Sequence, residues 1–181
     1  MPAITIFGGS RVTADSDEYG AALALGRALA ERGLTVVTGG YNGVMEAVSR
    51  GAKEGGGQVI GVTVEVIART FERVPNAFVD QEIKTAALLE RIDKLVELGA
   101  GYVVLPGGAG TLAELAVVWN LALFGALHGK PLIVVGHGWQ RVLDTMIDEL
   151  HTVDADLRFL RLVPDVETAV EVLTTTLAAE A

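Results

Sequence analysis

Short apolar runs alternate along the chain with longer stretches in which apolar residues recur at helical spacing. Apolar runs with few polar positions are typical of strands that are buried on both faces of a sheet. They predict strands at residues 3–7, 34–38, 58–64, 77–79, 102–105, 132–135 and 160–163. The stretches between them predict helices at residues 16–31, from 43 to the glycines at 55–57, and at 84–98, 112–124, 139–150 and 166–177.

Strands that alternate in this way with helices indicate a parallel sheet covered on both faces. The 181 residues contain no linker, internal repeat or low-complexity stretch, and this length suits one domain. We therefore expect a single α/β domain over residues 1–181. Its core would be a doubly wound, Rossmann-like parallel sheet of about six or seven strands, with helices on both faces.

The residues that follow the expected strand at 102–105 carry the clearest chemical signal. The run Leu105-Pro106-Gly107-Gly108-Ala109-Gly110-Thr111-Leu112-Ala113-Glu114 leads from that strand into the next helix. Glycines at the start of a helix place unpaired backbone N–H groups at the positive end of the helix dipole, an arrangement that binds phosphate. Glu114 follows one turn later, so its carboxylate can face the same ligand. This pattern indicates chemistry on a phosphorylated molecule.

A purely structural interpretation of the same run is a capping box. Thr111 and Glu114 have the required spacing, and in such a box both side chains only satisfy the first N–H groups of the helix. A capping box does not need the three glycines that precede it, however, and glycines cost backbone entropy unless the chain must approach something closely. We therefore favour phosphate binding.

Two other expected strands also end in glycine, and their loops add candidate ligand contacts. Gly8 and Ser10 follow the first strand, whereas Gly39 and Gly40 follow the second. In an open parallel sheet, ligands lie beyond the carboxyl ends of the strands where strand order reverses. If the first strand neighbours the strand at 102–105, two glycine loops face each other there. The first turn is not G-x-G-x-x-G and no G-x-x-x-x-G-K-[ST] occurs, which argues against a dinucleotide and against ATP hydrolysis.

Arg91 falls inside the apolar arc of the helix expected at 84–98. A guanidinium that faces the protein interior needs an anionic partner. One interpretation is structural: an ion pair with Glu114 or Asp80, or a position at the rim of the core. The other is functional: a guanidinium that faces the ligand.

The composition limits the possible partners and cofactors. The formal net charge is −9, whereas binding to nucleic acids or acidic membranes needs a basic surface. No apolar run approaches the ~20 residues that span a bilayer, so we expect a cytoplasmic protein. The chain has no cysteine, and His128, His137 and His151 lack paired ligand spacing. We therefore expect neither a metal nor a cofactor.

The motif Pro106-Gly107-Gly108-Ala109-Gly110-Thr111-Leu112-Ala113-Glu114 matches the P-G-G-x-G-T-x-x-E signature of the Lonely Guy (LOG) family. The chain resembles this family also at residues 7–10, 38–46, 56–62 and 90–91. Characterised members are phosphoribohydrolases, which cleave the N-glycosidic bond of nucleoside 5′-monophosphates to give free base and ribose 5-phosphate. The resemblance implies the same hydrolase activity on an AMP-like substrate. It also implies Arg91 and Glu114 as the catalytic pair, with the 5′-phosphate held by Gly107, Gly108, Gly110 and Thr111.

Two departures from the family pattern touch the expected pocket. Ile92 follows Arg91 where the family segment M-H-E-R-K has a lysine. The glycine motif at 39–43 is one residue shorter than the common form. The resemblance therefore does not identify cytokinin precursors as the natural substrate.

A function of another class is that of a binding or carrier protein for a phosphorylated ligand, such as a nucleotide or the molybdenum cofactor. Molybdenum-cofactor carriers have a similar fold and also use glycine-rich loops. The presence of both Arg91 and Glu114 favours the enzyme, because a carrier needs no carboxylate at the glycosidic carbon.

The oligomeric state can also be predicted. The helix at 112–124 is apolar nearly all round and must be covered on every side. Together with the family resemblance, this predicts a homodimer; the alternative is that helices of the same chain cover it.

Overall fold

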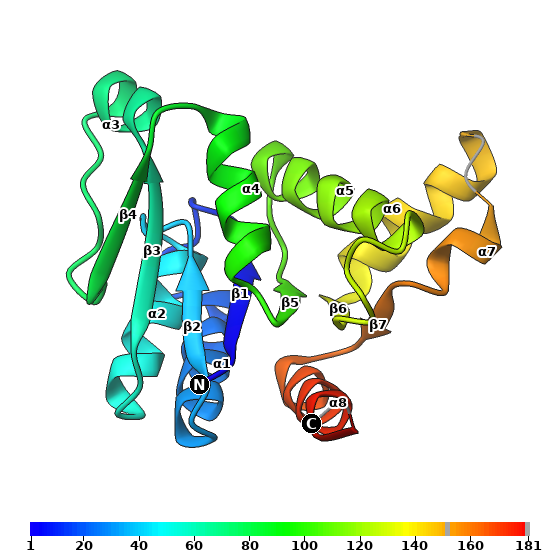
Figure 1. Ribbon diagram of the computed structural model, residues 1–181, viewed down its shortest axis with the longest axis horizontal. Helices are drawn as coiled ribbons and strands as arrows, with labels where there is room; N and C mark the ends of the chain where they lie inside the picture. Colours follow the sequence, from blue (N-terminus) through cyan, green and yellow to red (C-terminus); the bar gives the residue numbers. More distant parts are fainter. Residues whose placement is uncertain (151–152, 180–181) are drawn as a thin grey trace.

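The computed structural model describes residues 1–150 and 153–179. Seven parallel strands form one sheet in the order β4-β3-β2-β1-β5-β6-β7 (Figure 1). The chain builds the sheet outward from β1 in both directions, first towards β4 and then towards β7, as a doubly wound fold does. The strands are β1 (Ala3–Phe7), β2 (Thr35–Thr38), β3 (Val59–Val64), β4 (Gln81–Thr85), β5 (Gly101–Val104), β6 (Leu132–Val135) and β7 (Arg161–Val163).

Helices cover both faces of this sheet, and the alternation of side chains along the strands divides the core in two. Ile4 and Ile6 of β1 pack with α1, α2 and α8 on one face, whereas Phe7 packs with α4, α5 and α6 on the other (Figure 1). The fold class expected from the sequence is therefore confirmed. The helices are α1 (Asp17–Glu31), α2 (Val44–Glu54), α3 (Glu65–Phe71), α4 (Leu88–Leu98), α5 (Ala109–Leu123), α6 (His137–Glu149), α7 (Asp154–Leu157) and α8 (Val166–Ala179).

The strand order reverses at β1, which pairs with β2 on one side and with β5 on the other. Phe7 lies opposite Val104, so the loops that follow β1 and β5 start at the same level of the sheet. The backbone N–H of Gly9 donates to the carbonyl of Pro106 at 3.0 Å. The two glycine loops expected to face each other are thus in direct contact.

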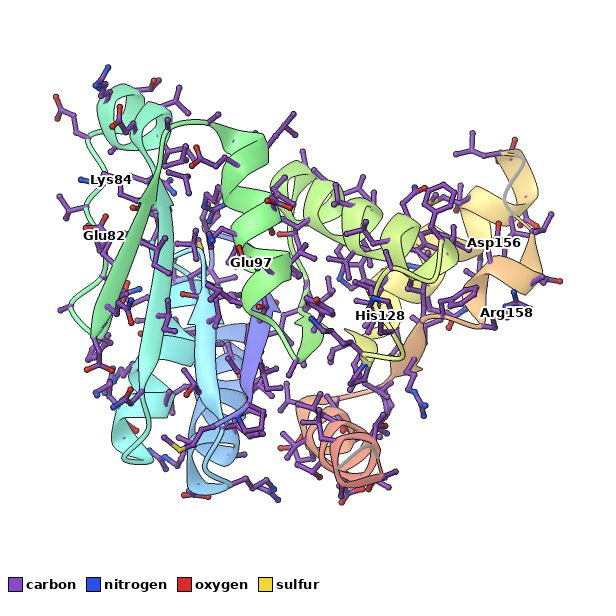
Figure 2. The ribbon with its side chains drawn as sticks, in the orientation of Figure 1. Glu82, Lys84, Glu97, His128, Asp156 and Arg158 are labelled. Atoms are coloured by element: carbon purple, nitrogen blue, oxygen red, sulfur yellow. The ribbon has the colours of Figure 1, made fainter. Side chains whose placement is uncertain are left out.

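The edge of the sheet beyond β3 differs from the sequence prediction. Residues 77–79 do not form a strand, and the edge strand is β4, so that α4 begins at Leu88 and not at residue 84. Only Thr85 of β4 is buried, and Glu82 and Lys84 lie along the outer edge of the sheet (Figure 2). An edge strand with polar side chains lacks the continuous apolar run from which the other strands were predicted.

Two short helices, α3 and α7, were also not expected, and α5 begins three residues earlier than predicted. Among the described residues, no helix combines the length and the apolar character needed to cross a membrane.

Candidate functional site

A cleft of about 370 Å³ lies where the carboxyl ends of β1, β2 and β5 meet the start of α5. This is the point at which the strand order reverses, the usual position of ligands in such folds. Its lining comprises Gly8, Gly9, Ser10, Arg11, Tyr41, Met45, Ile67, Arg73, Arg91, Gly108, Ala109, Gly110, Thr111 and Glu114.

The N-terminus of α5 forms one wall of the cleft. The helix begins at Ala109 with Gly108 as its N-cap, and no side chain of the described residues caps it. Its first backbone N–H groups therefore stand at the cleft without the intrahelical partners that later residues have. A Cβ atom placed on Gly108 or Gly110 would meet nothing within 4 Å. This wall has the free donors, the dipole and the open space that an anion requires.

The capping-box interpretation of Thr111 and Glu114 is wrong. It requires Thr111 to precede the helix, but Thr111 is already the third residue of α5. Its side chain packs against Gly107 instead, since a Cβ on Gly107 would lie 2.1 Å from Thr111 Oγ1. Gly107 itself lines a more open hollow beside the cleft, which shares Gly9, Arg11 and Gly108 with it.

Arg91 of α4 and Glu114 of α5 form a buried ion pair in the wall of the cleft. Arg91 Nη1 donates to Glu114 Oε1 at 3.2 Å, and Arg91 Nε donates to the carbonyl of Val62 at 2.8 Å. The two residues are only 5% and 8% exposed. Burial this deep excludes the rim position for Arg91, and its anionic partner is Glu114.

Asp80, the other partner considered for Arg91, is engaged elsewhere. Its carboxylate accepts from Lys53 Nζ at 2.7 Å and from the backbone N–H of Val59 at 2.8 Å. The interpretation in which Arg91 pairs with Asp80 is therefore wrong. Because Arg91 and Glu114 both line the cleft, their pairing is compatible with contact to a ligand.

The environment of Glu114 changes its proton affinity. Burial disfavours the charged carboxylate and raises the pKa of Glu114 to about 7, although the Arg91 guanidinium opposes the shift. Near neutral pH the carboxyl group can therefore both hold and release a proton. A carboxyl with such a pKa, placed in a cleft, is a candidate for acid–base chemistry.

Gly39 and Gly40, which follow β2, are not in the lining of the cleft, and Gly39 lies against Arg91. A Cβ on Gly39 would lie 1.7 Å from Arg91 Nη2 and 2.7 Å from Met45 Sδ. Gly40 has a φ of +76°, a left-handed conformation that favours glycine, and its N–H donates to Thr38 Oγ1 at 3.0 Å. Gly39 thus leaves the space that the guanidinium occupies.

The loop after β1 combines packing with access to the cleft. A Cβ on Gly8 would lie 2.4 Å from Val44 Cγ1, so this glycine lets the loop approach the start of α2. Gly8 and Ser10 both line the cleft, as expected from the sequence.

Sequence reasoning missed seven residues of the lining: Gly9, Arg11, Tyr41, Met45, Ile67, Arg73 and Ala109. The Tyr41 hydroxyl donates to the carbonyl of Val64 and accepts from its N–H, which fixes the ring 5.8 Å from the Arg91 guanidinium. Three arginines and one glutamate line the cleft of a chain whose net charge is −9. The local excess of positive charge suits an anionic ligand. The position of Arg11 directly after a glycine loop was the signal available in the sequence.

Residues 1–150 and 153–179 contain no cluster of three or more histidine, aspartate or glutamate side chains that could hold a metal ion. His128 and His137 belong to this part of the chain, whereas His151 lies outside the described residues.

A model of the SLOG cluster4 family matches residues 1–161. The cytokinin riboside 5′-monophosphate phosphoribohydrolase of Mycobacterium tuberculosis is 31% identical over 154 residues, which cover 82% of this chain and 81% of the relative. The cytokinin riboside 5′-monophosphate phosphoribohydrolase LOG of Oryza sativa subsp. japonica is 33% identical over 130 residues. That match covers 71% of this chain and 52% of the rice protein, so the chain spans about half of this relative.

Solved structures add relatives of another kind. The molybdenum cofactor carrier protein of Chlamydomonas reinhardtii superposes with a TM-score of 0.76 at 25% identity, and the match covers 98% of both chains. The molybdenum cofactor binding protein of Rippkaea orientalis superposes with a TM-score of 0.72 at 26% identity, covering 97% of both chains. Proteins named as hydrolases and proteins named as cofactor carriers therefore both resemble this chain over most of its length.

Proposed function

Because the chain belongs to the SLOG cluster4 family, we propose that it hydrolyses nucleoside 5′-monophosphates such as AMP to a free base and ribose 5-phosphate. The observation that carries the proposal is the Arg91–Glu114 pair, which is buried in the wall of the same cleft as the uncapped N-terminus of α5. The relatives named phosphoribohydrolases support it.

In this proposal the 5′-phosphate binds at the start of α5. The backbone N–H groups of residues 108–111 donate to its oxygens, and Ser10 and Arg11 approach from the loop after β1. The helix dipole and the arginine stabilise the phosphate dianion. Phosphate bound there holds the sugar beside Glu114, one turn further along the helix.

Glu114 acts on the glycosidic carbon. The C1′–N bond breaks, the base leaves with the electron pair and takes up a proton from solvent, and the oxygen of a water molecule bonds to C1′. The Glu114 carboxylate stabilises the positive charge that develops on the ribosyl group and accepts the proton that the water loses. Arg91 donates to Glu114 and holds the carboxylate in one orientation.

A second candidate function is that of a carrier for a phosphorylated ligand such as the molybdenum cofactor. The superposition on the Chlamydomonas reinhardtii carrier, over 98% of both chains, favours it. A carrier would use the same anion-binding wall but would not turn over a nucleotide.

Incubation with AMP, followed by chromatography, separates the two functions. The enzyme releases adenine and ribose 5-phosphate in equal amounts. Recovery of intact AMP, together with a rise in melting temperature when AMP is added, would support a carrier instead. If AMP at millimolar concentration gives neither the two products nor a change in melting temperature, that result would contradict nucleotide binding itself.

We also propose that the protein is a homodimer. Leu112 of α5 and Phe124, which caps its C-terminus, are 42% and 81% exposed, and Leu88 and Leu89 at the start of α4 are 48% and 76% exposed. The two helices are neighbours, so these apolar side chains suit burial against the same helices of a second copy. Light scattering at micromolar concentration should give about twice the chain mass of 19.0 kDa, and a value near 19.0 kDa would contradict the dimer.

A further inference from the structure

A second cavity, of about 220 Å³, lies where β6 and β7 begin, at the end of the sheet opposite the cleft. It is bounded by the turn at 125–130 that follows α5, by the start of β6, and by residues 158–161 at the start of β7. His128 and Arg158 line it from two of these segments, and both lie beyond the C-terminal half of α5 (Figure 2). The cavity therefore stands apart from the cleft at the N-terminus of the same helix.

Basic side chains surround this cavity. Lys130, Arg158, Arg161 and His128 line it, and no aspartate or glutamate is among its lining residues. Within the part of the chain that the structure describes, none of these four side chains forms an ion pair. Six other basic residues of that part do pair with a carboxylate: Arg27, Arg50, Lys53, Arg69, Arg91 and Lys94.

This concentration of charge is unusual in an acidic chain. With 23 acidic and 14 basic residues, carboxylates are available to pair with most cations, yet three permanent cations share one cavity without any. Like charges that line one cavity repel each other. The C-terminus of α5 offers about half a negative charge through its dipole. This balances only a small part of the three positive charges. The remaining positive charge favours an anion in the cavity.

The Arg158 side chain is positioned by stacking, and its N–H groups are left available for such an anion. Its guanidinium carbon lies 4.7 Å from the centre of the Phe159 ring, so the cation stacks on an aromatic face. Stacking restricts the side chain but uses none of its N–H groups, which remain available for bidentate contacts with phosphate oxygens.

We propose that this cavity, defined by Lys130, Arg158 and Arg161, is a second binding site for anions of the pyrophosphate class. Three permanent cations match the charge of a diphosphate group better than that of a single carboxylate or phosphate monoester. The cavity is smaller than the roughly 300–1,000 Å³ that enclose a drug-sized molecule, so it holds the phosphate groups and leaves any attached nucleoside outside. The proposal is independent of the hydrolase activity.

Calorimetric titration of the full chain with inorganic pyrophosphate tests this site. The variant Arg158→Ala/Arg161→Ala should lose one binding event per chain, or weaken it by at least about tenfold for each arginine removed. Arg141→Ala, which removes an exposed arginine of α6 that lies outside the cavity, should bind as the unaltered protein does. If the double variant melts at a lower temperature than the unaltered protein, Lys130→Gln serves as the second test. It should also weaken pyrophosphate binding.

Equal stoichiometry and affinity in the unaltered protein and in both cavity variants would overturn the proposal, as would the absence of pyrophosphate binding in the unaltered protein. Titration with ADP distinguishes the source of the diphosphate group. Binding of ADP that the same variants weaken indicates a nucleotide as ligand, whereas binding of pyrophosphate alone indicates the free anion. Because the readout is anion binding, failure of the hydrolase proposal in the AMP assay leaves this result unaffected.

Discussion

The glycines at the start of α5 and the glycine after β2 look alike in sequence but have opposite surroundings. A Cβ on Gly108 or Gly110 would meet nothing within 4 Å, whereas a Cβ on Gly39 would lie 1.7 Å from Arg91 Nη2. The first two leave space open to the cleft. Gly39 leaves space that a side chain of the protein itself fills. A glycine-ended strand in such a sheet therefore indicates close approach, but it does not say whether a ligand or the protein approaches.

In the proposed function this difference gives the two regions separate tasks. The start of α5 would supply anion-binding donors and carries Glu114, whereas Gly39 in the loop after β2 leaves the space for the Arg91 guanidinium, which donates to Glu114. Substitutions that affect one region and spare the other test this division.

Glu114→Gln should have the largest effect. The amide has the same shape as the carboxyl group and lies beside Arg91, but it cannot accept a proton from water. We expect release of adenine from AMP to fall by about 10³-fold, with AMP still bound and the fold retained by circular dichroism. Glu149→Gln, at an exposed glutamate of α6, is the matched control. A folded Glu114→Gln protein that hydrolyses AMP at the normal rate would reduce α5 to an anion-binding element.

Gly39→Ala should have the next largest effect, because the added methyl group displaces the Arg91 guanidinium. Misplacement of a positioning group by about 1 Å can cost 10²-fold in rate, and we expect kcat to fall by about that factor with a smaller change in KM. Arg91 lowers the pKa of Glu114, so its displacement should also move the acidic limb of the pH–rate profile to higher pH.

Gly20→Ala is the control for Gly39→Ala. Gly20 is exposed in α1 and has nothing within 4 Å of its Cβ position, so activity and pH profile should not change. If Gly39→Ala loses activity without a shift in the pH profile, the loop after β2 does not act through Glu114.

The pH dependence of the unaltered protein should follow Glu114. Its pKa is raised to about 7, and the proposed mechanism uses the carboxylate, so kcat should rise with pH through about 7. Below that pH the rate should fall about tenfold per unit. A rate that stays constant between pH 5 and pH 8 would exclude Glu114 as the proton acceptor.

The same pKa affects stability with the opposite sign. The folded state holds the Glu114 proton up to about pH 7, whereas the unfolded chain releases it near its ordinary pKa of 4.5. The contribution of Glu114 to stability is therefore fully present below about 4.5 and is lost as the pH rises through about 7. Urea unfolding should show that this loss disappears in Glu114→Gln.

The sequence predicts most of the fold because strands buried on both faces have an unmistakable apolar pattern. It fails at β4, where Gln81, Glu82 and Lys84 are exposed. This edge strand pairs with β3 on one side and has no neighbouring strand on the other. The sequence pattern there is typical of a loop that leads into a helix. The failure is thus confined to the strand in which burial, the main signal, is absent.

The candidate site is predictable where chemistry depends on neighbouring residues in the chain. The start of α5 is such a segment, and so is the position of Arg91 on an apolar helix face. The partner of Arg91 could not be selected between Glu114 and Asp80, because that choice depends on how two helices pack. The role of Gly39 was hidden for the same reason, since Arg91 is far away in the sequence.

The smallest expected effect comes from Gly110→Ala, and its sign separates the two kinds of glycine. Gly110 lies in the first turn of α5 and has no close neighbour, so alanine should stabilise the free protein by about 0.5–1 kcal/mol. Gly110 also lines the cleft, and the methyl group should crowd a phosphate bound there. We expect AMP affinity, measured by calorimetry in the Glu114→Gln background, to fall by up to about tenfold. Gly20→Ala should give a similar stabilisation with unchanged affinity. Gain of stability in Gly110→Ala with full affinity would show that no ligand uses the space at the start of α5.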